Sequence, residues 1–526
     1  MQLGFAMKAV RCLVRALAAL ILTAAQLSSQ QVMQLRNQIW GHLEVVTLDR
    51  DSAKLVPARC YLTDSAGRNW TPSGAITYVK PPEVDFIGQG EFEISLPPGA
   101  YTLRVEHGTE FRRLQRRVEI RPGEICHERL ELERWAGMNA RGWYSGDLHN
   151  HRDWREMPQI LLSEDLNLSP TLTRWVWDER LISIPPPAGE SLRAIRAVDA
   201  AHAYSILDTE IERLEMGSID LIGLRAPLEF RGSKLYPPSN VFTEVAHRQG
   251  GYVDAEKITW RDGTALIALG QVDFAGLVYN SFSPFGVEPT ADRSEDDVPD
   301  RLPYWAMEVY YKLLNCGFRL PVSAGTASGV KPTPLGYDRV YVHLREPFSY
   351  DAWFHALKDG RSFATNGPIL FLTVDGNEPG DTIELAAGPQ EKKQLRIRAE
   401  AVSQDDLEKL EVIWRGKVIR TINAPPGSHR IAADFEADAN QTGWFAARAF
   451  EKPAVTVRFA HTSPVYVRVG DDRGIVSQDA DYFVASMDQA IAFFKSAAGF
   501  RSPTERDAML SMFKQAREVY RRLASK

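Results

Sequence analysis

The spacing of apolar residues changes along this 526-residue chain, and these changes constrain its fold. Two segments, residues 35–138 and 346–472, alternate apolar and polar residues with the period of two that is typical of β-strands. Between them, residues 140–345 alternate helical stretches with short apolar runs, which indicates an α/β domain with parallel strands. Residues 480–526 have helical spacing. The sequence therefore predicts a multi-domain α/β plus β protein, in which two β-sandwiches flank the α/β domain and a helical tail follows.

The first β segment has two strand–turn–strand patterns. The alternating run at 92–96 is interrupted by Pro-Pro-Gly at 97–99 and resumes at 101–105. A second pair of runs, at 118–120 and 130–132, flanks Arg-Pro-Gly at 121–123. Both patterns predict β-hairpins. The stretch 90–108 (GEFEISLPPGAYTLRVEHG) resembles carboxypeptidase-regulatory-like sandwich modules, a resemblance that implies a spacer or adhesive role.

Local signals predict several further elements. Helices are expected at 191–204, at 241–248 before the Gly250-Gly251 turn, and at 304–315. Alternation at 410–414 ahead of Arg415-Gly416 predicts a hairpin turn in the second β segment. The sequence Ser-Pro-Thr-Glu at 502–505 is typical of a capping box at the start of the tail helix.

The first 29 residues have the features of a signal peptide. Lys8, Arg11 and Arg15 precede an apolar run at 16–25, which is about half the length of a membrane-spanning helix. We therefore expect a secreted or periplasmic protein without a stable membrane span after cleavage. The net charge of −6 gives no electrostatic reason to expect nucleic acid, so the expected partner is a small-molecule or cell-envelope substrate.

Two cysteines of the first β segment leave two alternatives open. Cys60 and Cys126 would form a disulfide in an oxidising compartment, or would remain as buried thiols. The chain has no Cys-x-x-Cys pattern, which argues against a cysteine-rich zinc site.

The most informative motif is Gly-Trp-Tyr-Ser-Gly-Asp-Leu-His-Asn-His-Arg at 142–152. On a β-strand, the spacing of His149 and His151 places both imidazoles on one face. Two such imidazoles at a strand end are suited to one divalent metal, and zinc, manganese and iron all accept imidazole with carboxylate oxygens. Asp147 alternates with the two histidines and is predicted to orient one of them without binding the metal itself.

This motif resembles the first motif of the PHP superfamily of metallohydrolases. The order of sandwich, motif and α/β domain, together with GRSFATNGP at 360–368, is similar to the CehA/McbA-like (carbaryl-hydrolase-type) branch. The resemblance implies a distorted (β/α) barrel. It also implies hydrolysis of an ester, a carbamate or amide, or a phosphoester by a metal-bound water. The chain has no Gly-x-Ser-x-Gly elbow, Walker loop or dinucleotide fingerprint, which argues against serine hydrolases, kinases and dehydrogenases.

The resemblance also assigns site residues. His149 and His151 match its first metal pair, and Glu210 matches its bridging glutamate. Apart from the resemblance, Glu256 is an alternative acid that could complete a single-metal site. The predicted catalytic residues, which would assist proton transfer or polarise a carbonyl, are Lys257 and His202. Further residues predicted to lie behind the ligands or to line the pocket are Arg174, Asp254 and Asn280.

The chain departs from the family pattern at several expected ligands. A Thr-Asp-His phrase is replaced by Thr-Arg-Trp at 173–175. A Gly-Ser-Asp-x-His phrase is replaced by Gly-Thr-Ala-Ser-Gly at 325–329, so that Ala327 and Gly329 stand where ligands would be. Neither residue has a side chain that can coordinate a metal. A full metal cluster is therefore not expected; the site would hold one ion, with zinc the first choice, or none.

Two functional hypotheses remain. The first is an exported metal-dependent hydrolase that uses His149, His151 and an acid. The second is a catalytically inactive PHP-like pseudoenzyme that binds a cell-envelope partner, glycan or peptide. The lost ligands favour the second hypothesis, as does the prospect of a sugar-stacking cleft formed by Trp154, Trp175 and Trp177.

Overall fold

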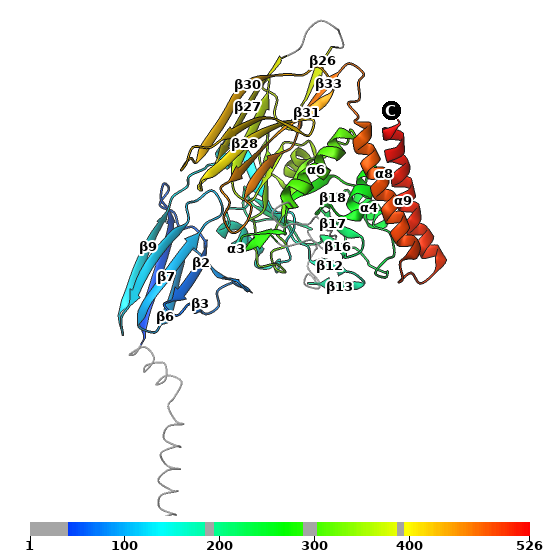
Figure 1. Ribbon diagram of the computed structural model, residues 1–526. Coiled ribbons are helices and arrows are strands. Elements are labelled where there is room, and N and C mark those ends of the chain that lie inside the picture. Colours follow the sequence, from blue (N-terminus) through cyan, green and yellow to red (C-terminus); the bar gives the residue numbers. More distant parts are fainter. Residues whose placement is uncertain (1–39, 185–193, 288–301, 387–393, 526) are drawn as a thin grey trace, which may run out of the picture.

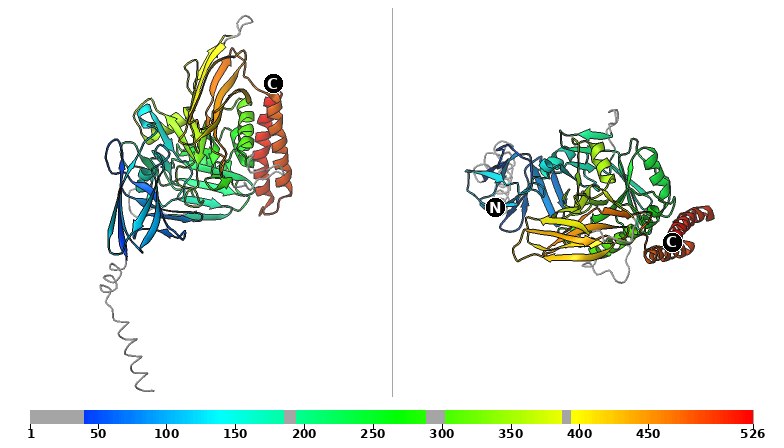
Figure 2. Two further views of the ribbon diagram at one scale, coloured as in Figure 1. Left: turned by 60° about the vertical axis from the view of Figure 1, so that its left-hand side comes forward. Right: turned by 90° about the horizontal axis from the view of Figure 1, so that it is seen from above.

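The computed structural model describes residues 40–184, 194–287, 302–386 and 394–525. The predicted signal peptide lies outside the described residues. The N-terminal strands and the C-terminal helices lie on opposite sides of a central region that contains both helices and strands, and further strands lie above this region (Figure 1, Figure 2). The protein is therefore multi-domain, of class α/β plus β, as the sequence predicts.

The N-terminal domain is a β-sandwich. One sheet has the order β6-β1-β9, and the other has the order β4-β5-β2-β7-β8 with β3 beside β2. The apolar faces of the two sheets enclose a core that includes Leu43, Leu62 and Leu103. The strands are β1 (Gly41–Asp49), β2 (Ala58–Asp64), β3 (Asn69–Trp70), β4 (Thr77–Lys80), β5 (Glu83–Gly88), β6 (Glu91–Leu96), β7 (Gly99–Glu106), β8 (Leu114–Ile120) and β9 (Ile125–Leu132).

The two hairpins predicted in this domain are wrong, although their strands are present. Strand β6 pairs with β1, whereas β7 pairs with β2 and β8. Similarly, β8 pairs with β7, whereas β9 pairs with β1. Each turn carries the chain from one sheet to the other, because the apolar faces of consecutive strands then pack against each other across the core. Side-by-side pairing would leave both faces in the same layer.

The central domain contains a seven-stranded sheet of order β13-β12-β16-β17-β18-β19-β22. The pairs β12–β16, β18–β19 and β19–β22 are parallel, and the other neighbours are antiparallel. The predicted α/β character is thus present, in a mixed rather than an all-parallel sheet. The strands are β12 (Arg174–Trp177), β13 (Arg180–Ser183), β16 (Thr209–Arg213), β17 (Gly217–Ile222), β18 (Tyr252–Ala255), β19 (Phe274–Tyr279) and β22 (Val322–Gly325); the short pair β20 (Phe282–Ser283) and β21 (Gly286–Val287) follows β19.

Helices of the central domain confirm two of the three expected there. The helix expected at 241–248 is α4 (Asn240–Arg248), and the one expected at 304–315 is α6 (Leu302–Asn315). The others are α3 (Met157–Ser163), α5 (Arg261–Ala268) and α7 (Tyr350–Lys358), with a 3-10 turn at Asn139–Arg141. The helix expected at 191–204 is wrong. Strands β14 (Ile195–Ala197) and β15 (Ala203–Ser205) form a hairpin instead, because the Asp199 side chain accepts a hydrogen bond from the Ala201 amide and stabilises a turn between them.

A second sheet runs from the central domain into the C-terminal domain. Its order is β14-β15-β11-β10-β23-β24-β32-β31-β28-β29, with β33 beside β31 and β26 beside β33. The expected domain boundary at 345/346 falls between β23 and β24, which pair with each other. The strands are β10 (Trp143–Gly146), β11 (Leu168–Pro170), β23 (Arg339–His343), β24 (Ser362–Thr365), β26 (Thr382–Leu385), β28 (Leu407–Trp414), β29 (Lys417–Asn423), β31 (Gly443–Glu451), β32 (Phe459–Thr462) and β33 (Val465–Val469).

The C-terminal domain is the second β-sandwich. A three-stranded sheet of β25 (Ile369–Val374), β27 (Gln394–Val402) and β30 (Arg430–Asp438) shares a hydrophobic core with the sheet that contains β28 and β31. The hairpin predicted at 410–416 is confirmed. Arg415 and Gly416 have φ angles of 50° and 81°, so both residues of the two-residue turn are left-handed, as such a turn requires.

The predicted helical tail consists of α8 (Ser477–Ser496) and α9 (Pro503–Ala524), which pack side by side along the central domain (Figure 1, Figure 2). The Ser502 hydroxyl accepts a hydrogen bond from the Glu505 amide, which confirms the capping prediction. The Tyr520 hydroxyl donates a 2.7 Å hydrogen bond to the Thr264 carbonyl in α5. The tail is therefore part of the central hydrophobic core.

Within the described ranges, no helix is long and apolar enough to cross a membrane. Cys60 and Cys126 both have free thiols, and Cys60 is buried, so the structure follows the thiol alternative.

Candidate metal centre

The two histidines lie in residues 147–151, directly after β10, and this segment forms backbone hydrogen bonds on both sides. On one side, the Leu148 amide donates to the Ala324 carbonyl at the end of β22, and the Ala327 amide donates to the His149 carbonyl. On the other side, the Leu172 amide donates to the Asn150 carbonyl, just before β12. The segment is thus held from both sides, and the rings of His149 and His151 both face Glu210.

Asp147 fixes this segment through the backbone rather than through a histidine ring. Its carboxylate accepts hydrogen bonds from the amides of His149, Thr326 and Gly336 and from the Thr326 hydroxyl. Burial raises the pKa of Asp147, and these donors partly offset that effect. The residue therefore holds the segment against the loop that follows β22.

Three buried side chains converge at the end of the sheet. His149 Nε2 and His151 Nε2 are 3.0 Å apart. Glu210 Oε2 lies 3.4 Å from His149 Nε2 and 3.0 Å from His151 Nε2. All three side chains are buried, and together they form a group that could hold a metal ion.

Neighbouring strands supply a row of acids beside these ligands. Glu210 on β16 is the register partner of Trp175 on β12 and of Asp220 on β17, and Asp220 is in turn the partner of Asp254 on β18. The Ser218 hydroxyl donates a 2.9 Å hydrogen bond to Glu210 Oε1, which leaves Oε2 to face the two imidazoles.

The second ring nitrogen of His149 faces a different acid. His149 Nδ1 lies 2.8 Å from Glu256 Oε1 and 3.8 Å from Asp220 Oδ2. The other oxygen of Glu256 contacts the Lys257 ammonium group. Glu256 thus lies behind His149, in the position from which a carboxylate orients a ligating imidazole.

The charges in this cluster are strongly coupled. Although burial disfavours the ionised form, the charge on His149 holds the pKa of Glu210 well below its usual range. Burial and the neighbouring carboxylates raise the pKa of Asp220 well above its usual range. The carboxylates also outweigh burial at His149 and raise its pKa, whereas burial lowers the pKa of His151. Binding of a metal by His149 would therefore release a proton.

The geometry of the three donors fits a small divalent ion. Ligand atoms about 2.0–2.1 Å from a tetrahedral zinc ion lie roughly 3.3 Å from one another, close to the separations of 3.0, 3.0 and 3.4 Å found here. Glu210 Oε2 is buried and has no hydrogen bond among the described residues. In the metal-free protein the charged His149 ring compensates this oxygen, and a bound cation would take over that role.

The backbone at Gly325 and Gly329 has no room for a side chain beside the two histidines. Gly329 has a φ of +105°, and a Cβ atom there would lie 2.5 Å from the His151 carbonyl carbon. A Cβ atom at Gly325 would lie 2.4 Å from His149 Cβ. The loop backbone therefore packs directly against the two histidines and occupies the space of a larger side chain.

The other predicted site residues are placed as follows. Lys257 is in the cluster, beside Glu256, and Asp254 accepts a 2.7 Å hydrogen bond from the Ser323 hydroxyl. The Arg174 guanidinium donates to the Leu228 carbonyl, while the adjacent Trp175 is the residue aligned with Glu210. His202 Nδ1 pairs with Asp199 in the turn between β14 and β15. Asn280 is buried directly after β19.

The predicted tryptophan cleft is occupied by protein groups. Trp175 lies 5.3 Å from the His151 ring and stacks on Trp177 at 5.5 Å. Arg180 lies 4.3 Å from the centre of the Trp177 ring, and Arg155 and Arg196 lie within 4.8 Å of the centre of the Trp154 ring. These rings therefore stack on residues of the chain itself, which weakens the case for a sugar platform.

Sequence reasoning missed Asp220. It lies in β17, all of whose residues are buried, within the run Ile-Asp-Leu-Ile at 219–222. A single carboxylate inside a fully buried apolar run was the available signal, since a buried charge requires a partner.

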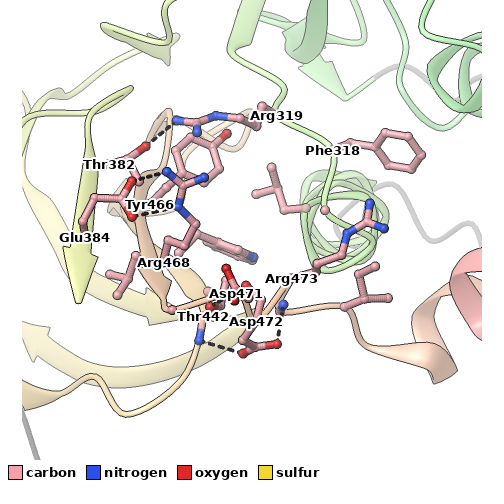
Figure 3. Close-up of a pocket in the computed structure, with 18 residues that line it drawn as sticks. Phe318, Arg319, Thr382, Glu384, Thr442, Tyr466, Arg468, Asp471, Asp472 and Arg473 are labelled. Atoms are coloured by element: carbon pink, nitrogen blue, oxygen red, sulfur yellow. Dashed lines mark hydrogen bonds and ion pairs between the residues drawn. The ribbon is translucent and has the colours of Figure 1, made fainter. Parts of the chain in front are cut away.

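A large cavity of about 640 Å³ lies away from this cluster, between the C-terminal sandwich and the end of α6 (Figure 3). Arg468 pairs with Glu384 on its wall, and Arg319 donates to the Thr382 hydroxyl. Its lining is of mixed charge and includes none of the metal-site residues.

Comparisons with known proteins do not identify a family. No family signature and no curated protein matches the chain. Among solved structures, the Bacillus anthracis TIE protein is 17% identical over 22% of this chain and 20% of its own, with a TM-score of 0.15. The Streptococcus agalactiae minor pilin GBS52 is 18% identical over 19% of this chain and 47% of its own, also with a TM-score of 0.15. The Parabacteroides merdae β-glucuronidase is 8% identical over 80% of this chain and 61% of its own, with a TM-score of 0.14. The matches thus span less than two thirds of each of these proteins.

Proposed function

We propose that the protein is an exported, single-metal hydrolase with a PHP-like central domain that cleaves an ester, a carbamate or amide, or a phosphoester. The observation that carries the proposal is the convergence of His149, His151 and Glu210, whose donor atoms lie within 4.8 Å of one another in a buried position. Zinc is the preferred ion, because two imidazoles and one carboxylate form a common catalytic zinc site.

The course of residues 147–151 supports a PHP-like barrel. The segment bonds to the end of β22, one edge strand of the seven-stranded sheet, and to the residues that lead into β12 near the other edge. Isolated bridges join Asn150 to Thr171 on one side and to Ser328 on the other. A segment bonded in this way joins the two ends of the sheet, as a distorted barrel requires.

Each residue of the cluster has a distinct role in this proposal. His149, His151 and Glu210 hold the ion, Ser218 orients Glu210, and Glu256 holds His149 so that Nε2 faces the ion. A metal held by these three residues would supply a bound water of lowered pKa as the nucleophile.

Lys257 is assigned an electrostatic role. It is buried beside Glu256, and despite burial the surrounding carboxylates raise its pKa. An ammonium group held in its charged form is a poor base, but it stabilises the carboxylate that orients His149. His202 is paired with Asp199 outside the cluster, and the proposal gives it no catalytic role.

A single ion is favoured over a cluster of ions. Ala327 and Gly329 provide no ligand, and the backbone at Gly329 packs against His151. The Lys257 charge already compensates Glu256, the carboxylate that faces Nδ1 of His149.

Elemental analysis of the purified mature protein tests the proposal. We expect about one zinc, manganese or iron ion per chain in the wild type and none in the His149→Ala, His151→Ala double variant. The control is His247→Ala, a histidine that pairs with Asp273 away from the cluster, and it should retain the ion. Ester, carbamate and phosphoester substrates would then be screened, and activity should be lost with the ion.

The pseudoenzyme is the second candidate, favoured by the missing ligands at Ala327 and Gly329. A wild-type protein that contains no ion after chelator-free purification would overturn the hydrolase proposal and support a binding role in the cell envelope.

A further inference from the structure

The N-terminal sandwich contacts the loop beside the metal centre through one tyrosine. Tyr78 is the only buried residue of β4 and is 5% exposed. Its hydroxyl accepts a 2.9 Å hydrogen bond from the Gly329 amide and donates to the Lys331 carbonyl. A residue more than 250 positions away in sequence thus satisfies two backbone groups of the loop after β22.

The same loop is hydrogen-bonded to the backbone of His149 and His151. The His151 amide donates a 2.6 Å hydrogen bond to the Ser328 carbonyl, and the Ala327 amide donates to the His149 carbonyl at 2.7 Å. Because Gly329 lies against the His151 carbonyl carbon with no space for a side chain, a displacement of the loop displaces His151. The Tyr78 hydroxyl therefore reaches His151 through two adjacent loop residues: it bonds to Gly329, and Ser328 bonds to His151.

Two further contacts join β4 and β5 to this region. The Arg152 guanidinium, next to His151 in sequence, lies 4.5 Å from the centre of the Tyr78 ring. Ile87 of β5 is buried in the core of the central domain. The N-terminal sandwich is thus packed against the central domain rather than linked to it as a separate spacer.

We propose that Tyr78 is a positioning residue of the metal centre, and that the N-terminal sandwich completes the site from outside. The inference rests on the proposed function, because it assigns His151 as a ligand. The tyrosine hydroxyl holds the loop in place, and the loop sets the position of His151 relative to His149 and Glu210. Groups hydrogen-bonded directly to metal ligands change metal affinity about 10- to 100-fold when mutated; Tyr78 acts through the loop, so the lower end of that range, about 10-fold, is expected.

The test compares Tyr78→Phe with Tyr101→Phe in the full mature protein. The first variant keeps the ring beneath Arg152 but removes the hydroxyl that holds the loop. The second removes a hydroxyl that donates a 2.8 Å hydrogen bond to the Pro97 carbonyl within the same sandwich, so it controls for a loss of domain stability. The measurements are zinc affinity by competition with a chelator, and hydrogen exchange of peptides that cover residues 147–152 and 325–331.

We expect Tyr78→Phe to weaken zinc binding by about 10-fold and to speed exchange in both peptides, and Tyr101→Phe to change neither. Unchanged zinc affinity in Tyr78→Phe would overturn the positioning role while leaving the hydrolase proposal standing. Equal losses in both variants would assign the effect to the stability of the sandwich and would also overturn it. A wild-type protein that binds no zinc, manganese or iron would overturn both proposals together.

Discussion

His149 Nδ1 lies 2.8 Å from Glu256 Oε1, while Nε2 of the same ring faces His151 and Glu210. The two nitrogens of one imidazole are thus divided between a carboxylate that orients the ring and a group suited to a metal. The raised pKa of His149 keeps the ring charged in the metal-free protein, and a metal that binds Nε2 would displace the proton there while Nδ1 continues to face the carboxylate.

We expect Glu256→Gln to weaken zinc binding about 10- to 100-fold without abolishing it, because the amide keeps the shape but loses the charge that orients His149. Competition with a chelator measures this change. The matched control is Glu212→Gln, an acid that accepts a hydrogen bond from Trp175 Nε1. A loss as complete as that of His149→Ala would instead identify Glu256 as a direct ligand.

Lys257→Met should lower the free energy of unfolding of the chelator-treated protein by about 3–5 kcal/mol. The lysine and Glu256 are both buried, and removal of one partner leaves the other charge unpaired. Lys358→Met is the comparison, because Lys358 pairs with Asp273 while its own side chain is 57% exposed, so about 1 kcal/mol or less is expected. Urea denaturation of both variants measures the difference; similar losses would argue against a buried compensating charge.

Gly325→Ala should weaken zinc binding and destabilise the protein by about 1–3 kcal/mol, because the new methyl group would overlap His149. Gly137→Ala provides the control, since a Cβ atom at Gly137 meets nothing within 4 Å. Zinc titration and thermal unfolding of both variants check this prediction. Normal zinc affinity in Gly325→Ala would mean that the loop can move away from the histidines.

The stability of the protein should depend on pH through His461. This histidine is fully buried on β32, where its Nε2 lies 2.8 Å from the Tyr311 hydroxyl, and burial lowers its pKa to about 3. The unfolded chain binds a proton near pH 6.5, so the neutral histidine contributes stability above that pH and loses it as the pH falls toward 3.

The matched comparison for this pH effect is His461→Gln. Between pH 6 and 4, the free energy of unfolding of the wild type should fall more steeply, by up to about 1.4 kcal/mol per pH unit. His127→Gln, at a position that is 70% exposed, should leave the slope unchanged. Parallel slopes for the wild type and His461→Gln would show that His461 is protonated in the folded protein.

Local patterns in the sequence predicted much of the architecture. The period of two along β27 and β28, the capping serine of α9 and the turn at Arg415-Gly416 are all encoded by neighbouring residues. The i and i+2 spacing of His149 and His151 predicted that the two rings would face one site, and they do, although the residues lie after the end of β10 rather than within a strand.

Strand partners and distant contacts could not be predicted in the same way. Strands β6 and β7 alternate as expected, but the choice between hairpin and sandwich depends on how two whole sheets pack. The position of Glu256 behind His149, and the contact of Tyr78 with the loop after β22, depend on segments that meet only in the folded chain. Sequence spacing carries no information about such contacts.

The sheet that contains β10, β23, β24 and β31 limits where the gene can recombine without disrupting the fold. A recombination event between residues 345 and 346 would separate β23 from β24 and expose two strand edges, which promotes aggregation. We therefore expect the central α/β region and the C-terminal sandwich to be kept together, and either half expressed alone to be prone to aggregation.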